Sequence, residues 1–452
     1  MLIKEHNLFE RSGRRGSSPG KKGVCAAPNG MKFRWPHRNH QAAILRRQHV
    51  LSQLPQMSEE DQRIFSWSVR PEVLAPFQEC LSGEMVLPVG VVGPFAIDMG
   101  IYDRHSSGEL QELTRTTENI FIPLAHTEGG LSESMLRGSH VTGMAEGIKT
   151  WVLQDEMTRD CAFVFDTAND ATSLHYWILA HERELKDWIN NPHHDGKMRK
   201  DGEQVARVSH HAVLLNIRTH VIGPVCHVLY GFDTQEACGP NMITRNAYAL
   251  NEHIVDQTGP LNLIPGNIFL EANMGGDKKP SYEYFHGGHG KTVVAESIIP
   301  DNLIARYLHT TAEQLQALEW AGLHGAQDSG MQSFSFTPAS AIAAVFAATG
   351  QDLGMVGTSS MAHATVSRVP DGVAFSITLK GLEVGTVGGG TGLPHAQSYL
   401  RMMGCEGPHS ARRLAQIIAA GTLALEISAA SSMASRGSEN FFRAHWTRGG
   451  LR

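Results

Sequence analysis

Hydrophobic and polar positions follow different periods in successive parts of the chain. Residues 40–54 have hydrophobic side chains at helical spacing, and the Ser-Glu-Glu triplet at 58–60 is typical of a helix start. These features predict a small helical region over residues 31–78. Residues 79–160 are richer in glycine and β-branched side chains, which predicts strands, glycine turns and one helix. Within them, residues 102–119 are polar and aperiodic, so we expect a surface loop there.

The second half of the pattern alternates between strand-like and helix-like runs. Between residues 161 and 270, β-branched and aromatic runs are interleaved with helical stretches near residues 180–189 and 241–255. Such alternation is typical of a separate α/β unit, here of about 110 residues. Residues 281–450 return to glycine- and alanine-rich sequence, with a long helix predicted over residues 411–434.

Composition limits the classes of protein to consider. A chain of 452 residues predicts two or three domains, and 39 basic against 45 acidic residues argue against a nucleic-acid-binding surface. Residues 1–30 are rich in glycine, serine and basic side chains and are predicted to be disordered. They contain no signal-peptide core, and no apolar run approaches the roughly 20 residues of a membrane span. We therefore expect a cytoplasmic protein with no membrane partner.

Cysteine and histidine patterns give no metal site. The six cysteines form no C-x-x-C pair, which excludes a zinc ribbon and a dithiol redox motif. The number of histidines, 24, is high. It reflects either chance variation in composition or a role in acid–base or metal chemistry. H-E-x-x-H is absent, because Leu185 stands where a second histidine would follow His181 and Glu182. The Rossmann glycine fingerprint and the P-loop are absent too, and we expect no metal.

Four glycine-rich segments carry conspicuous polar residues: 127–130 (TEGG), 273–280 (NMGGDKKP), 350–352 (GQD) and 385–391 (GTVGGGT). Each has an ordinary structural explanation, such as a helix-start carboxylate, a solvated lysine loop or a tightly packed turn. Each also has a chemical one, because lysines can stabilise an oxyanion and glycine amides can contact a ligand. A purely structural explanation is weakest for Asp352, because an acid at the end of a buried helix needs a cationic partner.

Together these segments resemble the catalytic part of the 3-hydroxy-3-methylglutaryl-coenzyme A reductase family. The motifs LPVGVVGP, HTEGG followed by RG, DEMTR, EACGPNMIT, DKKP, GQD and GTVGGGT occur in that family's order, from residue 79 to about residue 430. Their detail resembles the class I branch more than the class II branch, without the membrane anchor of animal and fungal relatives. The resemblance implies a homodimer or a dimer of dimers, with active sites at an interface to which the neighbour contributes the lysine loop.

The resemblance also implies an α/β (α+β) fold in several parts. Residues 79–160 and 271–452 would form a large mixed α/β domain that binds the thioester. Residues 161–270 would form an inserted, ferredoxin-like domain for the nicotinamide cofactor. The helical region 31–78 and the disordered residues 1–30 would precede them.

Site residues follow from the same resemblance, motif by motif. The implied catalytic residues are Glu128, Lys278, Asp352 and His445, the last preceded by a basic and a small residue. The implied cofactor-binding residues are Glu236, Gly239, Asn241, Met242, Gly388, Gly389 and Gly390. The implied substrate-binding residues are Arg159, Arg137, Lys279, Asn273 and Glu79.

The implied reaction converts 3-hydroxy-3-methylglutaryl-CoA to mevalonate and CoA by two hydride transfers. NADPH is the expected hydride donor, and NADH is not excluded, because no clear basic residue for a 2′-phosphate lies near Gly239. Lys278 would stabilise the oxyanion of the hemithioacetal, and His445 would protonate the departing thiolate. Glu128, kept protonated by burial and by Asp352, would protonate the aldehyde oxygen, and Asp352 would bridge the lysine and the glutamate.

Several positions depart from the family pattern. Pro240 removes a backbone donor beside the expected cofactor, Ser340 stands where class I enzymes have an asparagine, and His126 replaces a threonine next to Glu128. The segment 79–83 (ECLSG) replaces the usual ENVIG. These changes keep two alternatives open: a related reductase for another acyl thioester, and a catalytically silent homologue that binds a ligand or partner.

Overall fold

The computed structural model describes residues 68–105, 108–191, 209–287 and 289–447, and the short pieces 24–26, 32–34, 48 and 52. The contacts divide the chain into two units, Met1–Leu87 and Pro88–Arg452.

The described part of the first unit is small. β1 (Val24–Ala26) pairs with β2 (Lys32–Arg34) in antiparallel fashion. α2 (Pro71–Leu74) begins with a proline, whose missing N–H is not needed at a first helical position. Most of the predicted disordered segment 1–30 and of the predicted helical region 31–78 lies outside the described residues.

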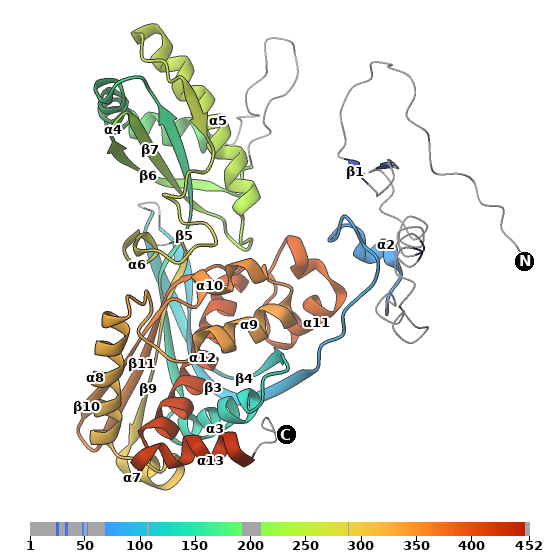
Figure 1. Ribbon diagram of the computed structural model, residues 1–452, viewed down its shortest axis with the longest axis vertical. Helices are drawn as coiled ribbons and strands as arrows, with labels where there is room; N and C mark the ends of the chain where they lie inside the picture. Colours follow the sequence, from blue (N-terminus) through green and yellow to red (C-terminus); the bar gives the residue numbers. More distant parts are fainter. Residues whose placement is uncertain are drawn as a thin grey trace, which may run out of the picture. The chain divides into compact units, whose positions relative to one another are not determined.

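The second unit is built on a mixed sheet with the strand order β10-β11-β9-β5-β3-β4 (Figure 1). Within it, β3 and β5 are parallel, and the other neighbours are antiparallel. Its strands are β3 (Val89–Arg104), β4 (Leu110–Ala125), β5 (Ile148–Val164), β9 (Gly290–Pro300), β10 (Ala362–Val369) and β11 (Gly372–Leu382).

β3 and β4 form a long hairpin where the sequence predicted a loop. β3 continues to Arg104 and β4 begins at Leu110, so the prediction of a surface loop over residues 102–119 is wrong. β4 is an edge strand, and most side chains in its first ten positions are exposed. No apolar alternation therefore marks this part of the strand in the sequence.

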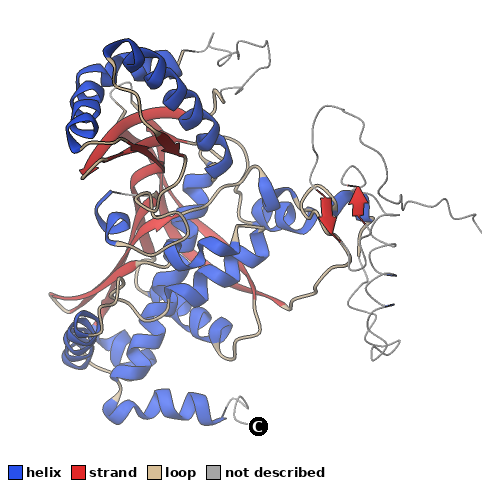
Figure 2. Ribbon diagram, turned by 45° about the horizontal axis from the view of Figure 1, so that its top comes forward, coloured by secondary structure: helices blue, strands red, loops and turns tan. Residues whose placement is uncertain are grey.

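β5 belongs to two sheets in turn. Its first half pairs with β9 and, briefly, with β3, and its second half, from Met157 onward, pairs with β7 (Val225–Asp233). β6 (Val213–Ile222) and β8 (Asn267–Phe269) complete this smaller sheet. α4 (Ala168–Ile189) packs on β6 and β7, α5 (Pro240–Thr258) packs on β5, and the two helices touch (Figure 2). Their side chains form a hydrophobic cluster of their own, drawn from residues between 157 and 270.

The larger hydrophobic cluster surrounds α12 (Ser410–Ala434), which agrees with the helix predicted over residues 411–434. α12 packs against β9 and against helices that include α3 (Leu131–Met144), α8 (Ala312–Asp328), α9 (Pro338–Thr349) and α13 (Glu439–Thr447). Among the described helices, α12 is long and apolar enough to cross a membrane, with a mean hydropathy of 1.5, but 83% of that stretch is buried in the protein. The absence of a long uninterrupted apolar run in the sequence did not predict this property, because polar residues such as Gln416 interrupt the helix.

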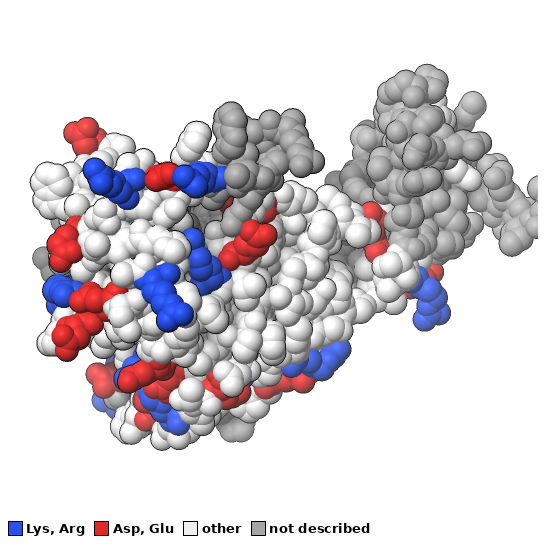
Figure 3. Space-filling model, turned by 90° about the horizontal axis from the view of Figure 1, so that it is seen from below, with Lys and Arg blue, Asp and Glu red and all other residues white. Residues whose placement is uncertain are grey.

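Shorter elements complete the second unit, and the α/β class expected from the sequence is confirmed. Charged side chains of both signs are interspersed on the face drawn in Figure 3. The remaining helices are α6 (Tyr282–Gly287), α7 (Asp301–Leu303), α10 (Val356–Ser359) and α11 (Pro394–Met402). Single 3₁₀ or π turns are η3 (Gly259–Leu261), η4 (Ile304–Leu308), η5 (Leu353–Met355), η6 (Gly389–Gly392) and η7 (Arg436–Ser438).

Candidate active site

Two of the four predicted catalytic residues form an ion pair. Lys278 Nζ lies 2.7 Å from Asp352 Oδ2, and each side chain is 45% exposed, so solvent and ligands can reach the pair. The hydrogen bond to Asp352 raises the pKa of Lys278. Burial acts to raise the pKa of Asp352, but hydrogen bonds from Lys278 and from the Gly354 N–H outweigh it and lower that pKa. The pair is therefore ionised at neutral pH, with an ammonium available to a developing oxyanion.

The backbone explains why Lys278 and Asp352 meet. Lys278 has a φ of 59°, a left-handed backbone conformation that turns the chain sharply after Asp277. Asp352 follows α9 and caps η5, where its side chain accepts a hydrogen bond from the Gly354 N–H at 2.9 Å. A carboxylate that is held in this way presents its second oxygen to the ammonium.

The loop after α9 contacts the glycine-rich segment 385–390. The Gln351 side chain forms two hydrogen bonds with the backbone of Gly385. Its Nε2 donates to the Gly385 carbonyl at 2.9 Å, and its Oε1 accepts from the Gly385 N–H at 3.0 Å. A Cβ on Gly350 would lie 2.2 Å from the Gly390 carbonyl oxygen, so only glycine fits there. The third and fourth polar segments of the sequence are thus one packed structure.

The segment that contains Glu236 joins this structure from the other side. The Glu236 carbonyl accepts hydrogen bonds from the N–H groups of Thr386 and Val387, and Ala237 forms a bridge with Val387. A Cβ on Gly385 would lie 2.3 Å from the Cys238 nitrogen, which again requires glycine at this close approach.

Among the predicted cofactor-binding residues, Glu236 uses its carboxylate for hydrogen bonds to other residues of the same chain. Its carboxylate accepts hydrogen bonds at the start of α12, from the His409 N–H at 2.6 Å, the Ser410 hydroxyl at 2.9 Å and the Ala411 N–H at 2.6 Å. A carboxylate at a helix N-terminus is favoured by the helix dipole. Glu236 also lines a polar cleft of about 820 Å³ between α4 and the start of α12, together with Lys186.

The other predicted cofactor-binding residues have geometry that a ligand could use. Gly239 has a φ of 87° and starts α5, so Asn241 and Met242 lie in the first turn of that helix. Gly388 and Gly389 have φ values of 83° and 54°, and a Cβ on either would point into open space. A planar ligand can therefore approach this backbone closely. Gly390 packs against Gly350 instead.

Glu128 stands apart from the lysine–aspartate pair within one chain. It is exposed in the turn that leads into α3, and it has no hydrogen bond or ion pair with any other described residue. α3 lies below α9 in Figure 1, whereas α6, which follows the Lys278 loop, lies above it near the smaller sheet. The unusual His126 nearby forms a hydrogen bond with Ser132 in the first turn of α3, with 2.7 Å between Nε2 and Oγ.

The two arginines predicted to bind substrate are tied to protein groups. Arg159 is 7% exposed, and its Nη1 pairs with Glu271 at 2.9 Å and with Asp277 at 3.3 Å. Arg137 reaches across to α12, where it donates to Ser428 Oγ at 3.0 Å and to Ser432 Oγ at 2.5 Å.

The remaining predicted residues are placed as follows. Asn273 and Lys279 are exposed in the loop that carries Lys278, and Asn273 has a φ of 69°. Glu79 is exposed after α2 in the first unit. His445 belongs to α13, but its side chain lies outside the described residues.

Two buried acids support the site and were missed in the sequence. Asp160, fully buried, accepts hydrogen bonds from the Ala272 N–H at 3.2 Å and the Met274 N–H at 3.1 Å, which anchors the lysine loop to β5. Asp155, on the same strand, pairs with Lys291 at 2.9 Å and Arg412 at 2.8 Å. Burial acts to raise the pKa of Asp155, but these two cations lower it. The signal available in the sequence was the presence of three acids, Asp155, Glu156 and Asp160, within one strand-like segment.

The comparison with known proteins decides the family. The sequence model of the hydroxymethylglutaryl-coenzyme A reductase family matches residues 43–449. The chain belongs to this family. The 3-hydroxy-3-methylglutaryl-coenzyme A reductase of Pyrococcus abyssi is 30% identical over 387 residues, which cover 84% of this chain and 86% of that protein. The Aeropyrum pernix enzyme of the same name is 33% identical over 379 residues, covering 82% and 81%.

A solved structure extends the likeness to the fold. The class II 3-hydroxy-3-methylglutaryl-CoA reductase of Streptococcus pneumoniae, bound to NADPH in open conformations, has a TM-score of 0.59 at 18% identity. It covers 86% of this chain and 97% of that one. The resemblance drawn from the sequence motifs is thus confirmed for the family and the fold, and the protein is an oxidoreductase of the hydroxymethylglutaryl-coenzyme A reductase family.

Proposed function

We propose that this reductase converts 3-hydroxy-3-methylglutaryl-CoA to mevalonate and CoA, with NADPH as the source of two hydrides. The balanced reaction consumes two NADPH and two protons for each thioester. The observation that carries the proposal is the exposed Lys278–Asp352 ion pair, 2.7 Å long, among the packed glycine segments. Membership of the family supplies the reaction class.

Lys278 acts on the oxygen of the substrate carbonyl. Addition of the first hydride to the thioester carbon places a negative charge on that oxygen, and the ammonium of Lys278 stabilises it. Collapse of this hemithioacetal breaks the carbon–sulfur bond and releases the CoA thiolate, which takes a proton from His445. The second hydride reduces the aldehyde, and Glu128 delivers the proton to its oxygen.

The cofactor is proposed to lie along the backbone of the second unit. Gly388 and Gly389, which leave open space beside their Cα atoms, fit the close approach of a nicotinamide or ribose. Gly239, Asn241 and Met242 at the start of α5 would supply the other side. The Streptococcus pneumoniae structure of the same fold holds NADPH, which supports this choice of cofactor over NADH.

A homodimer is proposed to complete the active site. Glu128 has no described partner in its own chain, whereas Lys278 and Asp352 already pair. A second copy that brings its Lys278 loop to Glu128 would join the three residues. We propose further that such dimers pair into a dimer of dimers and that the enzyme is cytoplasmic, as the family resemblance implies.

The decisive experiment measures NADPH oxidation with the purified full chain and 3-hydroxy-3-methylglutaryl-CoA. Two NADPH should be consumed for each CoA released. Lys278→Gln should lower kcat by about 10²–10³-fold, because it removes a charged donor to the oxyanion. Lys149→Gln, which removes an exposed lysine from β5, is the matched control and should retain activity. Folded protein without turnover, or equal effects of the two substitutions, would overturn the proposal.

A second candidate is a related reductase that acts on a different acyl thioester. Arg159 favours it, because this arginine, expected to bind the acyl carboxylate, is already paired with Glu271 and Asp277. NADPH consumption with a panel of acyl-CoA thioesters separates the two candidates. The first requires the highest kcat/KM for 3-hydroxy-3-methylglutaryl-CoA, and the second requires it for an acyl group without the distal carboxylate.

A further inference from the structure

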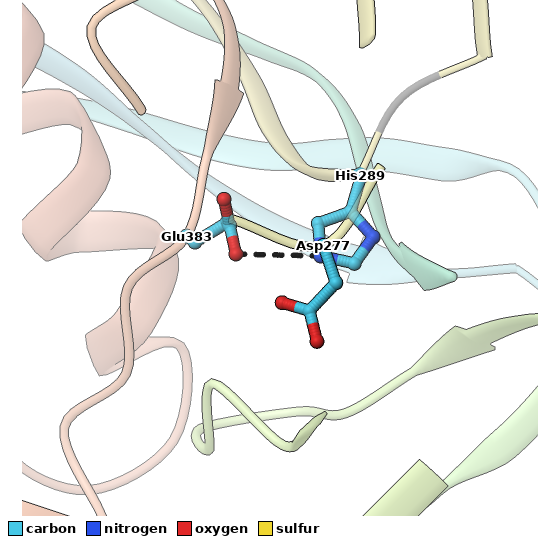
Figure 4. Close-up of side chains that lie close together, drawn as sticks. All are labelled: Asp277, His289 and Glu383. Carbon is cyan, nitrogen blue, oxygen red and sulfur yellow. Dashed lines mark ion pairs between the residues drawn. The ribbon is translucent and has the colours of Figure 1, made fainter. Parts of the chain in front are cut away.

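Three side chains from separate parts of the chain, one of them in the Lys278 loop itself, lie close together. Asp277 precedes Lys278, His289 precedes β9, and Glu383 follows β11. One potential metal-binding atom from each lies within 4.8 Å of the other two. Figure 4 shows the His289 ring facing Glu383, with the Asp277 carboxylate turned toward the same space. No spacing in the sequence connects these three positions.

Each of the three side chains is held at one polar atom and presents another to the shared space, where His289 Nε2 and Glu383 Oε2 lie 3.3 Å apart and form an ion pair when the imidazole is protonated. Asp277 Oδ2 is bound by Arg159, and Glu383 Oε1 accepts hydrogen bonds from Tyr284 and from Thr358. The opposite atoms, Asp277 Oδ1, Glu383 Oε2 and His289 Nε2, are buried and have no hydrogen-bond partner.

The burial makes these unpartnered atoms costly. His289 is 2% exposed and Glu383 is 1% exposed. A buried carboxylate oxygen or imidazole nitrogen without a partner loses the full free energy of its hydration. Three such atoms that share one space are what a bound cation would satisfy.

The local charge points the same way. Arg159 is shared between Asp277 and Glu271, and Glu383 contacts no lysine or arginine among the described residues. Two carboxylates therefore share one guanidinium, and the carboxylate of Glu383 contacts the His289 ring instead, which leaves an excess of two negative charges when His289 is neutral. Uncompensated buried charge is strongly unfavourable, and a divalent cation would cancel this excess.

The nearby lysines act on the cluster only at longer range, because each forms its ion pair with another carboxylate. Lys278 pairs with Asp352 at 2.7 Å, on the outer side of the loop. Lys291 pairs with Asp155 at 2.9 Å, on β5.

The surroundings of His289 also match a metal ligand. Its Nδ1 lies 2.7 Å from Thr158 Oγ1, and a proton on Nδ1 that is donated to this hydroxyl leaves the Nε2 lone pair directed at the carboxylates. The Thr158 N–H, at 3.3 Å from Nδ1, favours the opposite tautomer, in which Nε2–H faces Glu383 without a metal. These two tautomers are the two states that an experiment must separate.

We propose that Asp277, His289 and Glu383 bind one divalent transition-metal ion, with zinc the best match to one imidazole and two carboxylates. Tetrahedral zinc with bonds of about 2.0–2.1 Å separates its ligands by about 3.4 Å. The distance between His289 Nε2 and Glu383 Oε2 is 3.3 Å. The ion ties the Lys278 loop to the ends of β9 and β11, and one coordination position stays open to water.

The test uses the untagged full chain, stripped with a chelator and dialysed, with Zn²⁺ and Co²⁺ as probes. Elemental analysis should find one Zn²⁺ per chain, and Co²⁺ should give the visible absorption of a tetrahedral site. His289→Gln and Glu383→Gln should each abolish the stoichiometric binding. His363→Gln, which replaces another histidine with a buried unpartnered Nε2, is the matched control and should keep it.

Two further variants keep the test sharp if the glutamine variants fail to fold. Thr158→Val removes the group behind His289 without touching the ion and should weaken Zn²⁺ binding by about 10–100-fold. His289→Lys places an ammonium against the two carboxylates, so it should fold without zinc and show no Zn²⁺-dependent rise in its thermal midpoint. Stripped wild-type protein that takes up no stoichiometric Zn²⁺, or takes up as much as His289→Lys does, would overturn the proposal in favour of the Nε2–H tautomer.

Discussion

A dimeric active site predicts that two inactive variants restore each other. Glu128→Gln removes the proposed acid, and Lys278→Gln removes the oxyanion-stabilising ammonium. Each homodimer should lose about 10²-fold or more in kcat. The two substitutions were chosen because Lys278 pairs with Asp352 in one chain, whereas Glu128 is exposed and has no described partner there.

The expected recovery follows from counting sites. If each site takes Glu128 from one chain and Lys278 from the other, a mixed dimer has one site with both substitutions and one site with neither. The mixed dimer should then show half the wild-type kcat per dimer. If both residues act within one chain, every site carries one substitution and no recovery is possible.

The assay isolates mixed dimers by co-expression with two different affinity tags and two successive purifications. NADPH oxidation is then measured against wild-type protein that carries the same two tags. A dual-tagged Glu128→Gln homodimer is the control for contamination. Mixed dimers no more active than this control would refute a shared site, and a monomer with full activity would refute the dimer itself.

The remaining predictions concern single substitutions. Asp352→Asn removes the carboxylate that raises the pKa of the paired lysine, so the alkaline decline of kcat should begin at lower pH than in wild type, and an unchanged decline contradicts the pairing. Gly138→Ala places a Cβ 1.9 Å from the Ala424 carbonyl oxygen on α12 and should cost about 1–3 kcal/mol in urea unfolding, whereas Gly143→Ala, with open space beside it, should not destabilise. Burial raises the pKa of Glu426, so its contribution to stability is present at low pH and is lost as pH rises through that raised pKa. Glu426→Gln should remove this loss, and thermal midpoints at pH 5 and pH 8 that shift equally in both proteins would contradict it.

The sequence predicts the elements that bury a regular apolar face. α12, α5 and α9 were all expected, because their hydrophobic residues recur at helical spacing or form an unbroken apolar run. The hairpin of β3 and β4 was not expected, since the outer part of β4 is an exposed edge whose order comes from hydrogen bonds to β3. Backbone pairing of an exposed strand segment leaves no apolar alternation in the sequence.

The sequence motifs predicted which residues belong to the site, but not how these residues contact one another. The chemistry of Lys278 and Asp352 could be inferred from their glycine-rich frames, and the structure pairs them. The engagement of Arg159 by Glu271 could not be inferred, because it depends on how the loop after β8 folds back onto β5. The cluster of Asp277, His289 and Glu383 could not be predicted from the sequence either. Its members lie in three separate segments, and no motif joins them.

The sharing of β5 between two sheets has a mechanical consequence. The strand changes partner from β9 to β7 near Glu156 without interruption, so the chain enters the smaller α/β layer with no flexible linker. Asp155, clamped by Lys291 and Arg412, fixes this crossover point. The smaller sheet with its helices can therefore twist about the axis of β5. A larger rotation away from the main sheet would break hydrogen bonds between β5 and its neighbouring strands. Because Asp160 on the same strand anchors the lysine loop, a twist of β5 would also move that loop.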